Sequence, residues 1–183
     1  KLLMLTFGLL SPGKGLELML EALPAVVDRY PHLAYIILGA THPSIVQDSG
    51  EEYRLSLQRL ALDLGVHKQV IFVNRFVELQ ELCEYLSAAD VYVTPYPTQA
   101  QITSGTLAYA IGAGNAVVST PYWYAQELLA EGRGRLVPFS DPGAMAEQIV
   151  DLFDNPVERN VMRKKAYLFS RDMIWKKVAR RYL

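Results

Sequence analysis

The sequence predicts an α/β fold of the Rossmann type, in which one parallel sheet lies between two layers of helices. Six short apolar segments alternate along the chain with segments of helical periodicity. Hairpin signals are few, so helical crossovers should join the strands and make them parallel. Such crossovers are right-handed, and the commonest order for six strands is 3-2-1-4-5-6. We therefore expect a three-layer α/β/α domain with this strand order, followed by C-terminal helices.

The expected strands are short apolar runs bounded by polar residues, glycine or proline. The second run is apolar almost throughout, which is typical of a strand that is buried on both faces. The six expected strands are Leu2–Phe7, Leu33–Gly39, Val70–Val73, Val91–Thr94, Ala116–Ser119 and Arg135–Val137.

The expected helices follow from apolar residues that recur at helical spacing. Pro24 falls inside the first of these patterns and should kink that helix or split it in two. In the helix after the third strand we expect Leu79, Leu82, Cys83 and Leu86 to point inward. Residues 40–50 are expected to form a polar loop. One expected helix is built from small residues; it begins at 103–105 and reaches residue 114. The others cover residues 16–30, 51–64, 78–88, 124–129, 141–153 and 156–169, and Asp172 is expected to begin a last one.

Length and composition fit a single globular domain over residues 1–183, with a helical extension from residue 156 onward. A net charge of -1 argues against a general nucleic-acid binder. We expect no membrane span and no signal peptide. The single cysteine, Cys83, is expected to fill the core and fits a reducing, cytoplasmic compartment. The chain opens at Lys1 directly in its first strand, as an excised domain would.

Two loops rich in Gly, Ser and Thr follow the first and fourth strands. They are GLLSPGKG (residues 8–15) and TPYPTQAQITSG (residues 94–105). In the expected strand order these strands are neighbours at the switch point, where ligands bind beyond the carboxyl ends of the strands. A helix that begins at Thr103, Ser104 and Gly105 would present free N–H groups and a positive dipole end. Lys14, the only cation in either loop, would complete a phosphate or diphosphate site.

Simpler interpretations remain open at this point. Lys14 could be solvated, with Gly13 and Gly15 as turn formers, and Ser104-Gly105 could be an ordinary helix cap. His42 could face the cleft or only solvent.

The sequence lacks the motifs of several well-known catalytic and binding sites. GLLSPGKG is neither a P-loop nor the dinucleotide pattern GxGxxG. The three histidines lack metal-site spacing, and neither an Asp-x-Asp pair nor a Gly-x-Ser-x-Gly elbow occurs. Neither loop contains a carboxylate, which removes candidates for paired-carboxylate hydrolysis. We therefore expect no metal and no cofactor.

An ordered series of segments resembles the C-terminal, donor-binding domain of GT-B glycosyltransferases of family 4 (glycosyl transferases group 1). The resemblance covers nearly the whole chain and implies a two-domain enzyme. Such an enzyme moves a sugar from a nucleotide-diphosphate donor, such as a UDP- or GDP-sugar, to an acceptor, usually with retention and without a metal. The donor would bind this half, and the acceptor would bind mainly an N-terminal domain absent from this sequence. The segments are FGLLSPGKGLELMLEAL, YPHLAYIILGA, VIFVNRFVELQELCEYLSAADVYVTPY and AYAIGAGNAVVSTPYWYAQELLAEGRGRLVPFSDPGAMAEQI.

The resemblance also implies where the donor would bind. Lys14, next to Gly13, would hold the diphosphate, and the backbone around Phe76 and Val77 would face the base. The helix start would add its N–H groups to the diphosphate site at Thr103, Ser104, Gly105 and Thr106.

The chain departs from the family pattern at three positions. Leu9 stands where the family has an arginine five residues before its loop lysine, and Arg75 is a candidate for the missing charge. The family's two glutamates, separated by seven residues, fall on Gln101 and Tyr109. Gln101, at the catalytic position, can bond a sugar hydroxyl but cannot stabilise an oxocarbenium-like charge as a carboxylate does. Tyr109 could bond the ribose through its hydroxyl or be a core aromatic.

From Pro156 onward nine Lys or Arg residues accompany only two acidic residues. Such an end could contact an anionic membrane surface, which would suit a lipid-linked acceptor, or form a solvated helical face. By resemblance, the stripe formed by Ile174, Trp175, Val178 and Tyr182 would cross back to the N-terminal domain, and we expect it to be partly exposed.

Three functions are consistent with the sequence. The leading one is the donor-binding half of a nucleotide-sugar glycosyltransferase. The second is a non-catalytic sugar-nucleotide or glycan-binding module, and the third is a sugar-nucleotide epimerase of the GT-B fold.

Overall fold

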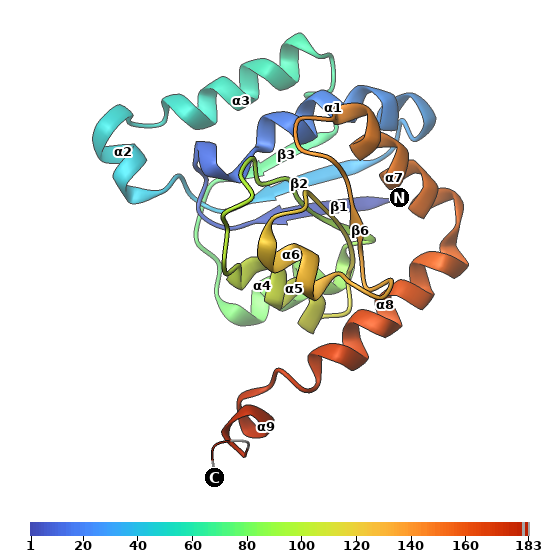
Figure 1. The fold of residues 1–183 in the computed structure, drawn as a ribbon. Helices are drawn as coiled ribbons and strands as arrows, with labels where there is room; N and C mark the ends of the chain where they lie inside the picture. Colours follow the sequence, from blue (N-terminus) through green and yellow to red (C-terminus); the bar gives the residue numbers. More distant parts are fainter. Residues whose placement is uncertain (181, 183) are drawn as a thin grey trace.

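A six-stranded parallel sheet runs through the centre of the domain, with helices on both of its faces (Figure 1). The computed structural model describes residues 1–180 and residue 182. The strand order is β3-β2-β1-β4-β5-β6, and every neighbouring pair is parallel, so the predicted order is confirmed. The strands are β1 (Leu3–Phe7), β2 (Ala34–Leu38), β3 (Val70–Val73), β4 (Val91–Thr94), β5 (Ala116–Ser119) and β6 (Arg135–Leu136).

The helices occupy the crossovers and the C-terminal part of the described chain. Most of their ends fall within one or two residues of the expected positions. They are α1 (Leu16–Arg29), α2 (Pro43–Ser49), α3 (Glu52–Asp63), α4 (Leu79–Ala88), α5 (Gly105–Gly112), α6 (Trp123–Leu128), α7 (Pro142–Asp154), α8 (Pro156–Ser170) and α9 (Trp175–Ala179), and a short 3-10 turn, η1 (Pro12–Lys14), precedes α1.

Two hydrophobic clusters, one on each face of the sheet, form the core. Helices α1, α3 and α7 cover one face, and α4, α5 and α6 cover the other (Figure 1). Successive strand residues alternate between the clusters, as the pleat of a strand requires: Met4 belongs to the first and Leu5 to the second. Burial on both faces explains why the central strands are apolar almost throughout.

Helix α1 remains one helix although Pro24 lies inside it. Of the two outcomes expected at Pro24, a kink or a split, the split is therefore excluded. Leu16, Met19, Leu20 and Leu23 are almost completely buried. Burying each such side chain stabilises by about 1.5–3 kcal/mol. An interior proline costs about 3 kcal/mol, so packing outweighs the cost of Pro24.

Two local expectations need correction. Residues 40–50 are not only a loop, because His42 caps the short helix α2: its Nδ1 accepts a hydrogen bond from the Ser44 amide at 3.2 Å. On α4 only Leu82 and Leu86 are buried, whereas Leu79 and Cys83 are exposed, so Cys83 does not fill the core. One residue turns a helix by about 100°, which carries Cys83 away from the narrow face centred on Leu82.

The last two described helices differ in their packing. Helix α8 packs against α5, whereas α9 lies away from the sheet near the C-terminus (Figure 1). The last helix begins at Trp175 rather than at Asp172. The stripe that begins at Ile174 is exposed as expected, with Trp175 86% exposed. Among the helices described, none is long and apolar enough to cross a membrane.

Part of the basic C-terminal region is bound to the domain itself. Arg163 donates from Nε to the Gly114 carbonyl at 3.0 Å, and Arg171 donates from Nη2 to the Gly112 carbonyl at 2.7 Å. A cation beside the final carbonyls of a helix is favourable, because those groups carry the negative end of its dipole. These two arginines therefore hold α8 against the end of α5.

Candidate functional site

The loops after β1 and β4 meet at the carboxyl edge of the sheet, as the sequence predicted. Lys14, the last residue of η1, donates from Nζ to the hydroxyl of Tyr96 at 2.9 Å. Tyr96 lies two residues beyond the end of β4. Because β1 and β4 are paired neighbours, their loops leave the sheet side by side.

Two glycines make this close approach possible. Gly15 has a φ of 61°, and a Cβ added there would lie 2.1 Å from the Pro95 carbonyl oxygen. Gly8 has a φ of 128°, and a Cβ there would lie 3.1 Å from Thr106 Cγ2 and 3.6 Å from Lys14 Nζ. Glycine adopts such angles without the penalty that a Cβ brings. The absence of side chains at residues 8 and 15 therefore leaves room for Lys14 between the two loops.

The N-terminus of α5 lies at the same place. Ser104 is its N-cap, and the Ser104 hydroxyl accepts a hydrogen bond from the Leu107 amide at 3.2 Å. The Thr106 hydroxyl lies 3.2 Å from the Ser104 hydroxyl and 3.1 Å from that of Tyr96. A Cβ on Gly105 would meet nothing within 4 Å, so the start of the helix is open to a ligand. The predicted helix start at Thr103–Gly105 is thus confirmed, with Lys14 linked to it through Tyr96.

Tyr96 is the buried centre of this polar cluster, with 4% of its surface exposed. Burial by itself would raise the pKa of its phenol. The charge of Lys14 and hydrogen bonds with Lys14, Ser104 and Thr106 outweigh that effect and hold the pKa of Tyr96 below its ordinary value. The phenol of Tyr96 is therefore strongly coupled to the lysine ammonium.

A cleft of about 380 Å³ opens over these groups. Among the described residues that line it, none carries a carboxylate. Gln101 lines the cleft and donates from Nε2 to the Thr103 carbonyl at 2.6 Å. His42 lines it as well, so this histidine is both exposed and part of the cleft. The lining residues are Gly8, Leu9, Ser11, Gly13, Lys14, His42, Tyr96, Gln101 and Thr106.

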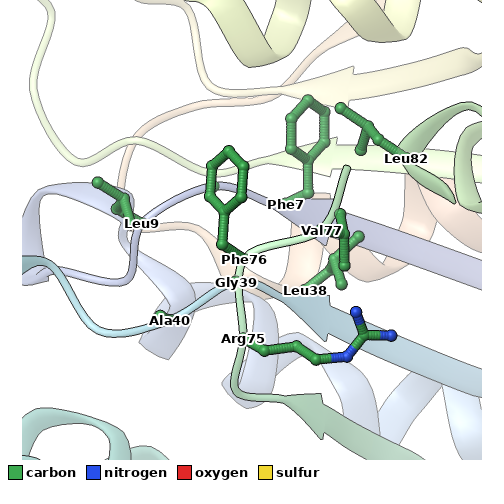
Figure 2. A pocket seen from close by; sticks show the side chains of 10 residues that line it. Phe7, Leu9, Leu38, Gly39, Ala40, Arg75, Phe76, Val77 and Leu82 are labelled. Carbon is green, nitrogen blue, oxygen red and sulfur yellow. The ribbon is translucent and has the colours of Figure 1, made fainter. Parts of the chain in front are cut away.

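A second, mostly apolar pocket of about 180 Å³ adjoins the cleft and shares Gly8 and Leu9 with it (Figure 2). Val77 lies in its wall, while Phe76 is 79% exposed at its side. Its described lining consists of Phe7, Gly8, Leu9, Leu38, Gly39, Ala40, Arg75, Phe76, Val77 and Leu82. Together, the cleft and this pocket give one compartment beside the Lys14 ammonium and one mostly apolar compartment.

The structure does not bring Arg75 to the Lys14 cleft. Arg75 donates from Nη1 to Glu81 Oε2 at 2.8 Å, and this hydrogen bond and the charge of Glu81 raise the pKa of Arg75. Figure 2 shows its guanidinium on the opposite side of the apolar pocket from Leu9. Lys14 is therefore the only Lys or Arg among the described lining residues of the cleft.

Tyr109, on α5, is not a core aromatic. It is 49% exposed, and its ring contacts the edge of Phe7 with centroids 6.3 Å apart. Phe7 lines the apolar pocket, so Tyr109 lies near that pocket with half of its surface free.

The sequence predictions missed two residues of this site. The first is Tyr96, which lies between Pro95 and Pro97 and belongs to no motif; its position just beyond a switch-point strand is the available signal. Gly8, which directly follows β1, is the second, although a glycine there often permits a close backbone approach. Among the described residues, no group of three or more His, Cys, Asp or Glu side chains could hold a metal ion.

Comparison with known proteins identifies the family. Residues 1–155 match the model of the family described as Glycosyl transferases group 1. This chain therefore belongs to the group 1 glycosyltransferases, as its motifs indicated.

Two curated relatives illustrate the similarity. The chain is 29% identical over 158 residues to the GDP-mannose-dependent monoacylated alpha-(1-6)-phosphatidylinositol monomannoside mannosyltransferase of Corynebacterium glutamicum, a match that covers 84% of this chain and 38% of the relative. It is 31% identical over 175 residues to the D-inositol 3-phosphate glycosyltransferase of Corynebacterium urealyticum, which covers 94% of this chain and 40% of the relative. The chain thus spans only about two fifths of the length of these relatives.

Solved structures share the fold at lower identity. HepE of Anabaena in complex with UDP superimposes with a TM-score of 0.79 at 20% identity, covering 92% of this chain and 43% of that one. The sucrose-phosphate synthase of Thermosynechococcus elongatus gives a TM-score of 0.81 at 22% identity, covering 99% and 43%. At these identities the match supports the Rossmann-like GT-B fold alone.

Proposed function

We propose that this chain is the donor-binding half of a glycosyltransferase that transfers a sugar from a nucleotide-diphosphate sugar. One observation carries the proposal: Lys14 and the open N-terminus of α5 border a single cleft whose described lining contains no carboxylate. The relatives add support, since the first is named as GDP-mannose-dependent and HepE holds UDP. The acceptor would bind mainly to an N-terminal domain of the full-length protein.

In this proposal the diphosphate binds between Lys14 and the start of α5. The ammonium supplies a charge-assisted hydrogen bond, and free N–H groups at Gly105 and Thr106 face the anion together with the Thr106 hydroxyl. Gly13 and Thr103 would border the diphosphate site on its two sides. With Leu9 in the loop, Lys14 is the only Lys or Arg among the described lining residues, and the helix dipole adds to its positive potential.

The base would occupy the neighbouring apolar pocket. Its wall at Val77 and the exposed ring of Phe76 suit a planar heterocycle. Because Gly8 and Leu9 line both hollows, we propose that one ligand spans the two. Tyr109 is proposed to bond the ribose through its hydroxyl, and its half-exposed position beside Phe7 supports this.

Gln101 is proposed to contact the transferred sugar from the side of the cleft. Its neutral amide would orient a hydroxyl, while Lys14 and the start of α5 would stabilise the nucleoside diphosphate leaving group. Transfer with retention and without a metal is part of this proposal.

The neutral Gln101 also favours a second candidate, a sugar-nucleotide-binding module without turnover. Turnover by the full-length protein separates this candidate from the first, and dependence of that turnover on an acceptor separates the first candidate from an epimerase. We expect the isolated chain to transfer nothing.

For the full-length protein we further propose a cytoplasmic location with peripheral membrane contact. The first relative acts, by its name, on a phosphatidylinositol monomannoside. Lys164 and Lys176 are exposed on the C-terminal helices and could approach anionic lipid.

The direct test is a thermal-shift panel with UDP, GDP, ADP and their sugars. A ligand at 100 times its Kd stabilises by about 2.7 kcal/mol, which raises the melting temperature of a domain of this size by roughly 5–11 °C. We expect at least one nucleotide to produce this shift, Lys14→Ala to reduce it strongly, and Lys68→Ala, at an exposed lysine outside the cleft, to leave it unchanged. The assignment fails if no diphosphate shifts the wild-type chain, or if Lys14→Ala responds as the wild type does.

A further inference from the structure

Lys14 does not extend freely into solvent, because its ammonium is held by one phenol. Its Nζ donates to the Tyr96 hydroxyl at 2.9 Å and lies 4.7 Å from the centroid of the Tyr96 ring. The same hydroxyl is within 3.1 Å of the Thr106 hydroxyl and 3.4 Å of the Ser104 hydroxyl. Tyr96 thus joins the lysine to the start of α5 through one oxygen atom.

Tyr96 itself has little freedom to move. Its ring stacks on that of Tyr122, with centroids 4.9 Å apart and planes inclined by 23°. Its carbonyl accepts a hydrogen bond from the Thr120 hydroxyl at 2.6 Å. Lysine has a flexible four-carbon stem with many accessible rotamers. A rigid acceptor therefore confines a side chain that would otherwise sample many positions.

We propose that Tyr96 is a positioning residue that fixes the Lys14 ammonium beside the N-terminus of α5 for contact with an anionic ligand. The ammonium has three N–H donors, and the bond to Tyr96 uses one and leaves two for phosphate oxygens. Confining the lysine before binding reduces the entropy lost when the ligand arrives. The inference rests on the proposed function for the identity of the ligand, a nucleoside diphosphate.

The position of Lys14 matters here because no second cation shares its task. Leu9 lines the cleft where the family has an arginine, and Arg75 is paired with Glu81. A misplaced lysine would leave the diphosphate with helix N–H groups and hydroxyls alone. Tyr96 therefore controls the only full positive charge that a Lys or Arg of the described lining contributes.

A double-mutant cycle measured by titration calorimetry tests this role. The variants are Tyr96→Phe, Lys14→Met and the double substitution, and the probes are UDP and GDP, with uridine and guanosine as ligands without phosphate. Tyr96→Phe keeps the stacked ring and removes only the oxygen. The matched control is Tyr122→Phe, because the Tyr122 hydroxyl lies 3.2 Å from the Thr94 hydroxyl, whereas the described hydrogen bond of the Lys14 ammonium goes to Tyr96.

We expect Tyr96→Phe to weaken binding of the better diphosphate about five-fold, and Tyr122→Phe to change it less than two-fold. In the Lys14→Met background, Tyr96→Phe should have no further effect, because the lysine that it positions is gone. Nucleoside binding should be the same in all variants. A purely structural role of Tyr96 would instead weaken all ligands in both backgrounds.

Three results would overturn the inference: unchanged diphosphate affinity in Tyr96→Phe, an equal loss in the Lys14→Met background, or an equal loss for the nucleosides. The proposed function fails separately if wild type binds neither diphosphate or if Lys14→Met binds as tightly as wild type, and the ligand role of Tyr96 then falls with it. A ligand-free readout covers a poorly folding Tyr96 variant. In the Lys14→Met protein, the Tyr96 Cζ resonance should titrate at a higher pH than in wild type, and an unmoved midpoint would contradict the contact.

Discussion

Replacing Gly15 with alanine should separate the two loops that form the site. The new Cβ would lie 2.1 Å from the Pro95 carbonyl oxygen, 3.1 Å from the Pro95 carbonyl carbon and 3.3 Å from Pro97 Cδ. The clash is with backbone, so the loop after β4 must move. That movement would pull Tyr96 away from Lys14 and open the polar cluster at the start of α5.

The cost of Gly15→Ala has two parts. Holding a non-glycine residue at a φ of 61° costs about 1–2 kcal/mol. Accommodating an extra carbon in a packed contact costs about 1–3 kcal/mol, and the smaller conformational entropy of the unfolded chain offsets about 0.4–1 kcal/mol. The sum is about 3 kcal/mol, which corresponds to a melting temperature lower by roughly 6–12 °C.

Thermal and urea unfolding followed by circular dichroism would measure this loss. Gly13→Ala is the matched control, because its Cβ would meet only Ser11 Oγ, at 3.8 Å, and its φ lies outside the left-handed region. We expect the control to stay within about 0.5 kcal/mol of wild type. If Gly15→Ala and Gly13→Ala unfold together with the wild type, the close approach of the two loops is not as described.

Three further predictions concern the core. Leu23→Ala, at a fully buried position of α1, should lower the free energy of unfolding by about 2–5 kcal/mol in urea titrations, and a loss below about 1 kcal/mol would contradict its packing. Asn115→Ala removes the donor that bonds the Leu86 and Ala89 carbonyls at 2.7 and 3.3 Å, so we expect a loss of about 1–3 kcal/mol in the same titrations; wild-type stability would mean that these bonds are immaterial. Burial raises the pKa of Tyr122 to about 12, above the value of about 10 in an unfolded chain, so its contribution to stability is complete below about pH 10 and is lost as the pH rises toward 12. Urea midpoints between pH 9 and 12 should therefore fall less steeply in Tyr122→Phe, and identical slopes would refute this.

The sheet could be predicted well because each strand is a short apolar run whose ends are marked by neighbouring residues in the sequence. Val91–Thr94 is bounded by Asp90 and Pro95 and is buried at all four positions, so composition and bounds coincide. The strand order followed from the crossover helices and the handedness of βαβ units. Neither inference required knowledge of side-chain contacts.

The errors arose where a local pattern had more than one structural outcome. Pro24 is a helix breaker by propensity, yet the burial of the surrounding leucines keeps α1 continuous. Cys83 shares helical spacing with Leu82 and Leu86, but α4 buries only a narrow face. Residues 40–50 are mostly polar, and their composition alone does not distinguish a loop from the short helix capped by His42.

The site was predictable at the level of loops but not of contacts. Strand order alone places Lys14 and the Ser104 cap at one edge of the sheet. The hydrogen bond from Lys14 to Tyr96 depends on two tertiary features. Gly15 has no side chain to clash with the loop after β4, and the ring of Tyr122 stacks on that of Tyr96. For the same reason Tyr96 belongs to no sequence motif, and only its position just beyond a switch-point strand marks it.

A titration of the ¹⁵N-labelled chain with UDP and GDP, followed through its amide resonances, tests most directly where a nucleoside diphosphate binds. The account predicts that the largest shifts cluster at residues 8–15 and 101–107, with smaller shifts near Phe76 and Val77. Shifts concentrated on α8 and α9 or along the outer edge of β3, or no shifts at ligand concentrations up to the millimolar range, would contradict a donor site formed by Lys14 and the start of α5.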